Sequence, residues 1–126
     1  MGAFDRLERV SEVEWAIPAH GRMLVPGRIF ADEATIEQLL AESLDEAQWS
    51  ALRQITHVAS MPGILSAAIA LPDVHPGYGF PIGGVGAFDP DSGVVVVGGV
   101  GFDFNCGVRV LRTPLDEKGI APYLDR

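Results

Sequence analysis

The sequence predicts an α+β fold in which two short helices are followed by a mostly β, glycine-rich half. Amphipathic helical patterns occupy residues 32–60, short apolar runs of strand length follow them, and ten of the fifteen glycines lie between Gly77 and Gly107. A chain of 126 residues suits one small domain. We divide it into an extended segment (1–31), a helical segment (32–60) and a β-rich, glycine-rich segment (61–112) that holds the candidate metal site.

The first thirty residues predict extended chain with turns, because prolines and glycines interrupt every apolar run. A helix is expected to begin near Asp32 or Thr35, since Thr35 and Gln38 have the spacing of a capping box. Apolar residues three and four positions apart then share one helical face. They are Ile36, Leu39 and Leu40.

A second helix is expected to begin at Ser43, because Ser43 and Glu46 repeat the capping-box spacing. Pro62 and Gly63 are expected to end it. Its predicted apolar stripe consists of Leu44, Ala47, Ala51, Leu52, Ile55 and Val58.

Four short apolar runs predict strands in the second half of the chain. Residues 64–71 form the first run. Residues 85–88 and 94–97 predict a β-hairpin, because the five residues that join them are rich in turn formers. Residues 108–111 predict a further short strand.

The overall composition is that of a globular protein, with 48% apolar and 21% charged residues. Every apolar run is shorter than the eighteen or so residues that a membrane span needs, and the N-terminus lacks the apolar core of a secretory signal. One cysteine, Cys106, cannot build an internal disulfide framework. We therefore expect a cytoplasmic protein that has no membrane partner.

The chain is acidic, with a formal net charge of -8. Residues 1–60 hold ten acids and five bases, and residues 61–126 hold seven acids and four bases. A nucleic-acid binder normally carries a positive patch. Composition alone therefore argues against a nucleic-acid partner.

The concentration of glycine after residue 77 needs a physical reason, because glycine loses more conformational entropy on folding than other residues. The backbone could require positive φ there, or another group could approach it closely. A series of tight turns in a small β domain is the alternative explanation.

Asp103 and Cys106 are the candidate metal ligands. They are three residues apart, so their side chains can converge on one point if the backbone turns between them. A thiolate with a carboxylate suits zinc, manganese, iron or cobalt better than magnesium or calcium. Two ligands do not complete a site. Alternatively, Asp103 caps a turn and Cys106 fills the core as a small hydrophobic residue.

Asp73 and His75 are two residues apart, which places them on the same face of a strand. The aspartate could fix the tautomer of the histidine or share a ligand role with it. His75 could bind metal, contact phosphate, transfer a proton or act as a structural hydrogen-bonding group. Arg109 follows the Asp103–Cys106 pair, where it could hold a phosphate or neutralise Asp103.

Two long motifs closely resemble signatures of the RtcB family of RNA ligases. The first is LPDVHPGYGFPIGG at residues 71–84, and the second is GGVGFDFNCGVR at residues 98–109. Shorter likenesses occur at residues 25–31, 61–64 and 111–113. The resemblance covers nearly the whole chain from about Trp15, and it implies that the chain is part of the larger RtcB-type fold.

The resemblance implies a specific activity. RtcB proteins join an RNA end that bears a 2′,3′-cyclic phosphate or a 3′-phosphate to a 5′-hydroxyl end, in tRNA splicing and RNA repair. They use GTP and manganese. A histidine becomes guanylylated, the guanylate passes to the RNA 3′-phosphate, and the 5′-hydroxyl then displaces GMP. Many of them work with the partner archease.

Motif matching also implies roles for individual residues. Asp103 and Cys106 correspond to manganese ligands of the family, and Cys106 corresponds to the ligand that bridges two manganese ions. Asp73 matches an acidic position linked to activity. We therefore expect Asp73 and Cys106 to be catalytic residues.

The resemblance also implies what the chain lacks. The other metal-binding histidines of the family, the guanylylated histidine and most GTP contacts match nothing before Arg126. We therefore expect this chain alone to be incomplete and inactive, and its exposed surfaces to favour self-association. The alternative is a short, non-catalytic RtcB-like module for binding or assembly.

Overall fold

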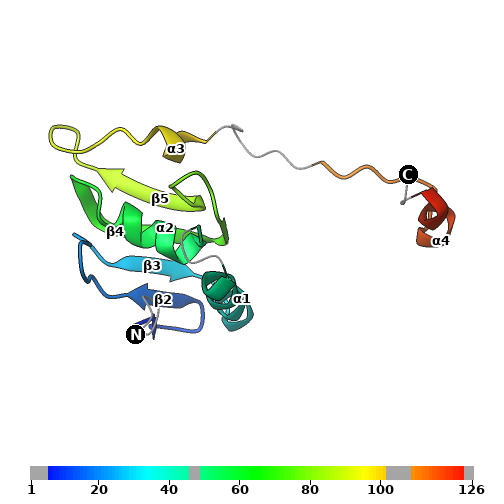
Figure 1. Cartoon of the computed structure of the whole chain (residues 1–126), viewed down its shortest axis with the longest axis horizontal. Helices are drawn as coiled ribbons and strands as arrows, with labels where there is room; N and C mark the ends of the chain where they lie inside the picture. The colour runs from blue at the N-terminus through cyan, green and yellow to red at the C-terminus, as the bar shows by residue number, and fades with distance from the viewer. Residues whose placement is uncertain (1–5, 46–48, 102–108, 124–126) are drawn as a thin grey trace.

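A computed structural model describes residues 6–45, 49–101 and 109–123. The chain forms a mixed five-stranded sheet with its two longer helices packed against it (Figure 1). The predicted α+β class is confirmed. Within the described residues, no helix is long and apolar enough to cross a membrane.

The sheet has the strand order β1-β2-β3-β4-β5. Neighbouring strands are antiparallel, except for β3 and β4, which are parallel. A parallel pair requires a crossover connection, and the two main helices supply it between β3 and β4. The extended segment expected at the N-terminus therefore forms three of the strands. The bounds are β1 (Glu8–Arg9), β2 (Glu14–Ile17), β3 (Gly27–Phe30), β4 (Ile64–His75) and β5 (Ile82–Phe88).

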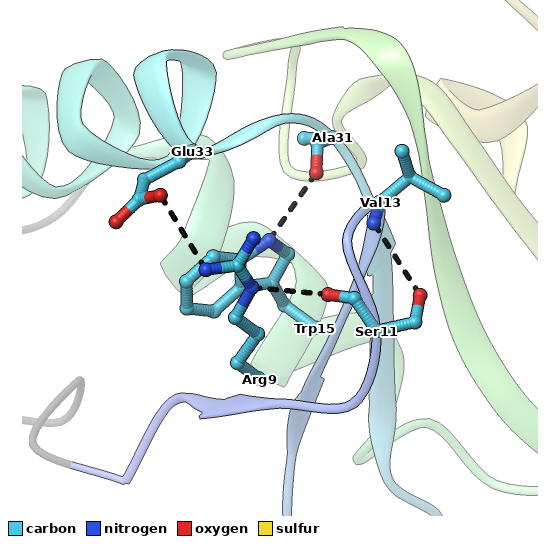
Figure 2. A network of polar contacts seen from close by, with 6 residues as sticks. All are labelled: Arg9, Ser11, Val13, Trp15, Ala31 and Glu33. Atoms are coloured by element: carbon cyan, nitrogen blue, oxygen red, sulfur yellow. Dashed lines mark hydrogen bonds and ion pairs between the residues drawn. The ribbon is translucent and has the colours of Figure 1, made fainter.

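A small network of polar contacts ties the first strands to the beginning of the helical segment (Figure 2). The Arg9 guanidinium lies 5.4 Å from the centre of the Trp15 ring and 3.4 Å from a carboxylate oxygen of Glu33. The indole N–H of Trp15 donates to the carbonyl of Ala31 at 3.2 Å. Since the Arg9–Glu33 pair is exposed, the packing of Trp15 contributes more to stability than that ion pair.

Helix α1 (Glu33–Asp45) begins directly after Asp32, the first of the two starts that the sequence offered. The backbone N–H of Thr35 donates to the Asp32 carboxylate at 2.8 Å. This hydrogen bond satisfies a free N–H of the first turn, and it holds the pKa of Asp32 below its ordinary value.

The predicted start of the second helix at Ser43 is wrong. Helix α1 continues to Asp45, and the Ser43 hydroxyl donates to the carbonyl of Leu39 at 2.7 Å. A serine can make this bond inside a helix, so capping-box spacing does not require a helix to begin there. Helix α2 (Ala51–Val58) begins after Ser50, whose hydroxyl accepts from the N–H of Arg53.

The predicted apolar stripe is confirmed where α2 exists. The prediction that Leu44 belongs to this stripe is wrong, because Leu44 lies on α1 with 86% of its surface exposed. Ala47 lies outside the described residues. The buried members of the stripe are Ala51, Leu52, Ile55 and Val58.

Exchanging each serine for alanine tests which of them caps a helix. Ser50→Ala should lower the free energy of unfolding by about 1 kcal/mol, because a helix N-cap is lost. Ser43→Ala should cost about 0.5 kcal/mol or less, since alanine is the better helix former. Urea denaturation of both variants measures the difference. A loss for Ser43→Ala equal to that for Ser50→Ala would contradict the assignment.

One hydrophobic core lies between the sheet and the helices. It combines residues from β2, β3 and β4 with the inner faces of α1 and α2. It holds α2 against β4, and thereby places α2 beside the chain that follows this strand. The largest fully buried apolar side chains are Ile17, Ile29, Leu52, Ile55 and Val58.

The first strand and the turn of the hairpin predicted at residues 85–97 are confirmed, but its second strand is wrong. Strand β5 and the turn after it exist, and the carboxylate of Asp89 accepts three hydrogen bonds from Ser92 and Asp91, which lower its pKa. Residues 94–96 form no strand, and the next element is the helical turn α3 (Val97–Val100).

The strand predicted at 108–111 is wrong over residues 109–111, which have no regular structure, and residue 108 lies outside the described residues. Two short elements that the sequence did not indicate follow them. They are helix α4 (Glu117–Ile120) and the 3-10 helix η1 (Ala121–Tyr123).

Candidate functional site

Asp73 lies in an irregular part of the pairing between β4 and β5. Residues 71–74 stand opposite the single residue Gly83, because Ala70 pairs with Gly84 and His75 pairs with Ile82. Bulges of this kind redirect side chains. The carboxylate of Asp73 is directed over Gly83, where an added Cβ would lie 2.7 Å from Oδ1. Gly83 also has a φ of 73°, so two independent reasons favour glycine there.

Asp73 and His75 are both exposed, on either side of the buried Val74, as expected for residues two apart on a strand. Their contact differs from the expected one. Nδ1 of His75 lies 2.7 Å from the backbone carbonyl oxygen of Asp73, rather than from its carboxylate. Because a carbonyl can only accept, Nδ1 carries a proton. Nε2 of neutral His75 is then free to accept a proton or a metal ion.

Gln54 fastens the loop after β4 to helix α2. Its side chain is 1% exposed and makes two hydrogen bonds to one residue: Nε2 donates to the carbonyl of Gly77 at 2.6 Å, and Oε1 accepts from the N–H of Gly77 at 2.8 Å. A side chain at position 77 would collide with the carbonyl oxygen of Phe80. The loop that begins beside Asp73 and His75 is therefore held in one position.

Sequence reasoning missed Gln54, although the sequence carries a signal for it. Position 54 is three residues after Ala51 and four before Val58, so a polar residue stands on the apolar stripe of the helix. A buried amide must find partners, since an unpaired polar group in the core is costly.

The two glycine-rich motifs meet at this loop. A Cβ added to Gly98 of α3 would lie 2.8 Å from the carbonyl oxygen of Tyr78, and one added to Gly99 would lie 3.1 Å from the Phe80 ring. Close approach, the second reason proposed for the glycines, thus applies to both residues. This packing also gives a reason why the strand predicted at residues 94–97 is absent at Val97, where the helical turn α3 begins.

The predicted metal ligands Asp103 and Cys106 lie outside the described residues. The described chain reaches Gly101, two residues before Asp103. Within the described part, no group of three or more histidine, cysteine, aspartate or glutamate side chains could hold a metal ion. The donor set of one carboxylate and one thiolate suits manganese or zinc by its chemistry. Because both residues lie outside the described part, the metal-ligand roles of Asp103 and Cys106 stay predictions.

Arg109 is described, and it is exposed. None of the ion pairs among the described residues involves it. That Arg109 holds a phosphate or neutralises Asp103 stays a prediction.

Comparison with known proteins identifies the class to which this fold and site belong. The family model described as "tRNA-splicing ligase RtcB" matches residues 54–126, more than half of the chain. The range includes Gln54, both glycine-rich motifs and the Asp103–Cys106 pair. The chain belongs to the RtcB family.

Individual relatives agree with the family model. The chain is 47% identical over 119 residues to the tRNA-splicing ligase RtcB of Thermococcus kodakarensis, covering 94% of this chain and 23% of that protein. It is 42% identical over 120 residues to that of Pyrobaculum aerophilum, again covering 94% and 23%. It is 51% identical over 104 residues to that of Methanocaldococcus jannaschii, covering 81% of this chain and 10% of that protein. The chain thus spans about a quarter or less of the length of these relatives.

Proposed function

We propose that this chain forms the N-terminal part of a GTP- and manganese-dependent RNA ligase. The enzyme joins ends that bear a 2′,3′-cyclic phosphate or a 3′-phosphate to 5′-hydroxyl ends, in tRNA splicing or RNA repair. One observation carries the proposal: α3 of the second motif packs on the loop of the first motif through Gly98 and Gly99. Two segments that resemble signatures of one enzyme family therefore meet at one place.

In this proposal, Asp103 and Cys106 hold manganese together with ligands from outside the chain. When bound, the divalent ion neutralises phosphate oxygens and makes the phosphorus a better electrophile. Most contacts to GTP also come from residues that this chain does not contain.

In this proposal, described residues of the first motif and of α2 act on the RNA ends. The Asp73 carboxylate is exposed above Gly83 and can accept the proton of a reacting hydroxyl. The Gln54–Gly77 hydrogen bonds keep the adjoining loop in place, so the geometry exists before RNA binds. Archease is a proposed partner on the basis of the family resemblance alone.

A chimera tests the proposal. This chain replaces the matching 119 residues of the Thermococcus kodakarensis relative, and joining of a 3′-phosphate RNA to a 5′-hydroxyl RNA is measured with GTP and manganese. We expect the chimera to ligate within about tenfold of the parent, because the exchange preserves both motifs.

The 126-residue chain by itself is the matched control for the chimera. It should form no covalent guanylate with labelled GTP and manganese, since none of its three histidines lies in the nucleotide-accepting motif. A folded chimera without ligase activity would contradict the proposed function. A labelled band from the short chain would contradict its incompleteness.

A non-catalytic binding or assembly module is the second candidate. It is favoured by valines that the structure leaves in solvent, including Val95 at 90% and Val97 at 76% exposure. They follow β5, which is at the edge of the sheet. Exposed apolar side chains beside a strand at the edge of a sheet favour self-association. The same chimera separates the candidates, because a module without catalytic residues would not support joining.

A further inference from the structure

The acidic charge of the chain is unevenly distributed. Residues 15–31 and 49–72 contain no aspartate or glutamate, although the whole chain has seventeen. These two segments contain three arginines and two histidines: His20, Arg22, Arg28, Arg53 and His57. Arg28 is paired with Glu14. The other four residues line hollows beside helix α2.

Two neighbouring hollows flank α2. One has a volume of about 370 Å³ and is lined by Trp49, Arg53, Gln54, His57 and Gly79. The other has a volume of about 510 Å³, and His20, Arg22 and His57 are among its lining residues. His57 belongs to both, and among the described residues neither lining includes an acidic one. We call the two hollows together the α2 groove.

The groove combines an aromatic surface with positive charge. Trp49, Arg53 and His57 are spaced four residues apart, which places Arg53 and His57 on one side of α2. The Trp49 side chain is 57% exposed. Among the described residues, no carboxylate forms an ion pair with Arg53. An exposed indole stacks on nucleic-acid bases, and a guanidinium binds phosphate, so together they suit a single-stranded nucleic acid.

The groove also lies next to the candidate site. Gly79 lines the smaller hollow, and it belongs to the loop that Gln54 holds through Gly77. This loop follows directly after His75, the last residue of β4. A nucleic-acid strand that is bound along α2 therefore leads toward Asp73 and His75.

We propose that the α2 groove binds a single-stranded segment of the RNA substrate, with a base stacked on Trp49 and phosphates held by Arg53 and Arg22. The choice of RNA as the polyanion rests on the proposed function. The groove carries the local positive charge that the average composition conceals, and it guides an RNA end to the loop of the first motif, on which the second motif packs.

The test measures binding of a fluorescein-labelled twelve-residue oligouridylate to the purified 126-residue chain by fluorescence anisotropy, without GTP or metal. We expect binding at low salt that weakens as salt rises, because phosphate contacts release counterions. Trp49→Ala and Arg53→Gln should each raise Kd by about fivefold or more, since a stacked base contributes ~1–3 kcal/mol. Trp49→Phe should stay within about twofold, because phenylalanine also stacks.

Arg112→Gln is the matched control. It removes the same charge from an exposed residue outside both hollows, and it should change Kd by less than about twofold. An oligomer of equal length with abasic sugars should bind about fivefold more weakly to the parent chain, and equally to the parent and Trp49→Ala. Circular dichroism confirms that each variant is folded.

Three results would overturn the proposal: absence of binding at low salt, equal weakening by Arg112→Gln and Arg53→Gln, or displacement of the RNA by polyglutamate at equal charge concentration. The binding assay contains neither GTP nor metal, so it is independent of ligation. An inactive chimera with intact groove-dependent RNA binding would contradict the proposed function and leave this inference standing. An active chimera without groove-dependent binding would contradict this inference and leave the proposed function standing.

Discussion

Replacing Gln54 with leucine is expected to lower the free energy of unfolding by about 2–4 kcal/mol. The change removes two hydrogen bonds and leaves the N–H and the carbonyl of Gly77 without their partner. Leucine has a similar volume, so the loss comes from unsatisfied polar groups rather than from a cavity. Urea denaturation measures the stability, and hydrogen exchange at the Gly77 amide reports on the loop.

Gln38→Leu is the matched control, because Gln38 is an exposed residue of α1 that bonds to Glu42 on the same helix. This substitution should change stability by about 0.5 kcal/mol or less. A loss below about 1 kcal/mol for Gln54→Leu, together with unchanged exchange at Gly77, would show that these hydrogen bonds do not hold the loop.

Cys106→Ala in the chimera is expected to reduce RNA joining by about 100-fold or more. Loss of a group that only supports a metal ligand commonly costs 10–100-fold, and loss of the ligand itself should cost at least as much. Asp103→Asn should have an effect of similar size, because an amide binds a divalent cation more weakly than a carboxylate does. The assay measures the ligation rate and the manganese bound per chain.

Asp91→Asn is the control for charge, since Asp91 is exposed in the turn after β5. It should leave ligation and metal content unchanged. Ligation at the parental rate by Cys106→Ala, at the usual manganese concentration, would remove Cys106 from the metal site. The interpretation of Cys106 as core filling would then be preferred.

Short-range patterns in the sequence were sufficient for several elements. Asp32 as the start of α1, the buried stripe of Leu52, Ile55 and Val58, and the turn after β5 all follow from residues within four positions of one another. Such features depend on local backbone geometry and on helical periodicity, which adjacent residues encode. The family was also evident in the sequence, because two long motifs occur in order.

Long-range contacts settled the remaining features. Residues 94–97 predict a strand, yet residues 94–96 form none and α3 begins at Val97, because Gly98 and Gly99 allow close packing on the loop at Tyr78 and Phe80. Gln54 and Gly77 are twenty-three residues apart, so their pairing exists only when α2 lies beside the end of β4. Side chains that meet across such separations compete for space and hydrogen bonds, and a one-dimensional pattern does not record the outcome of that competition.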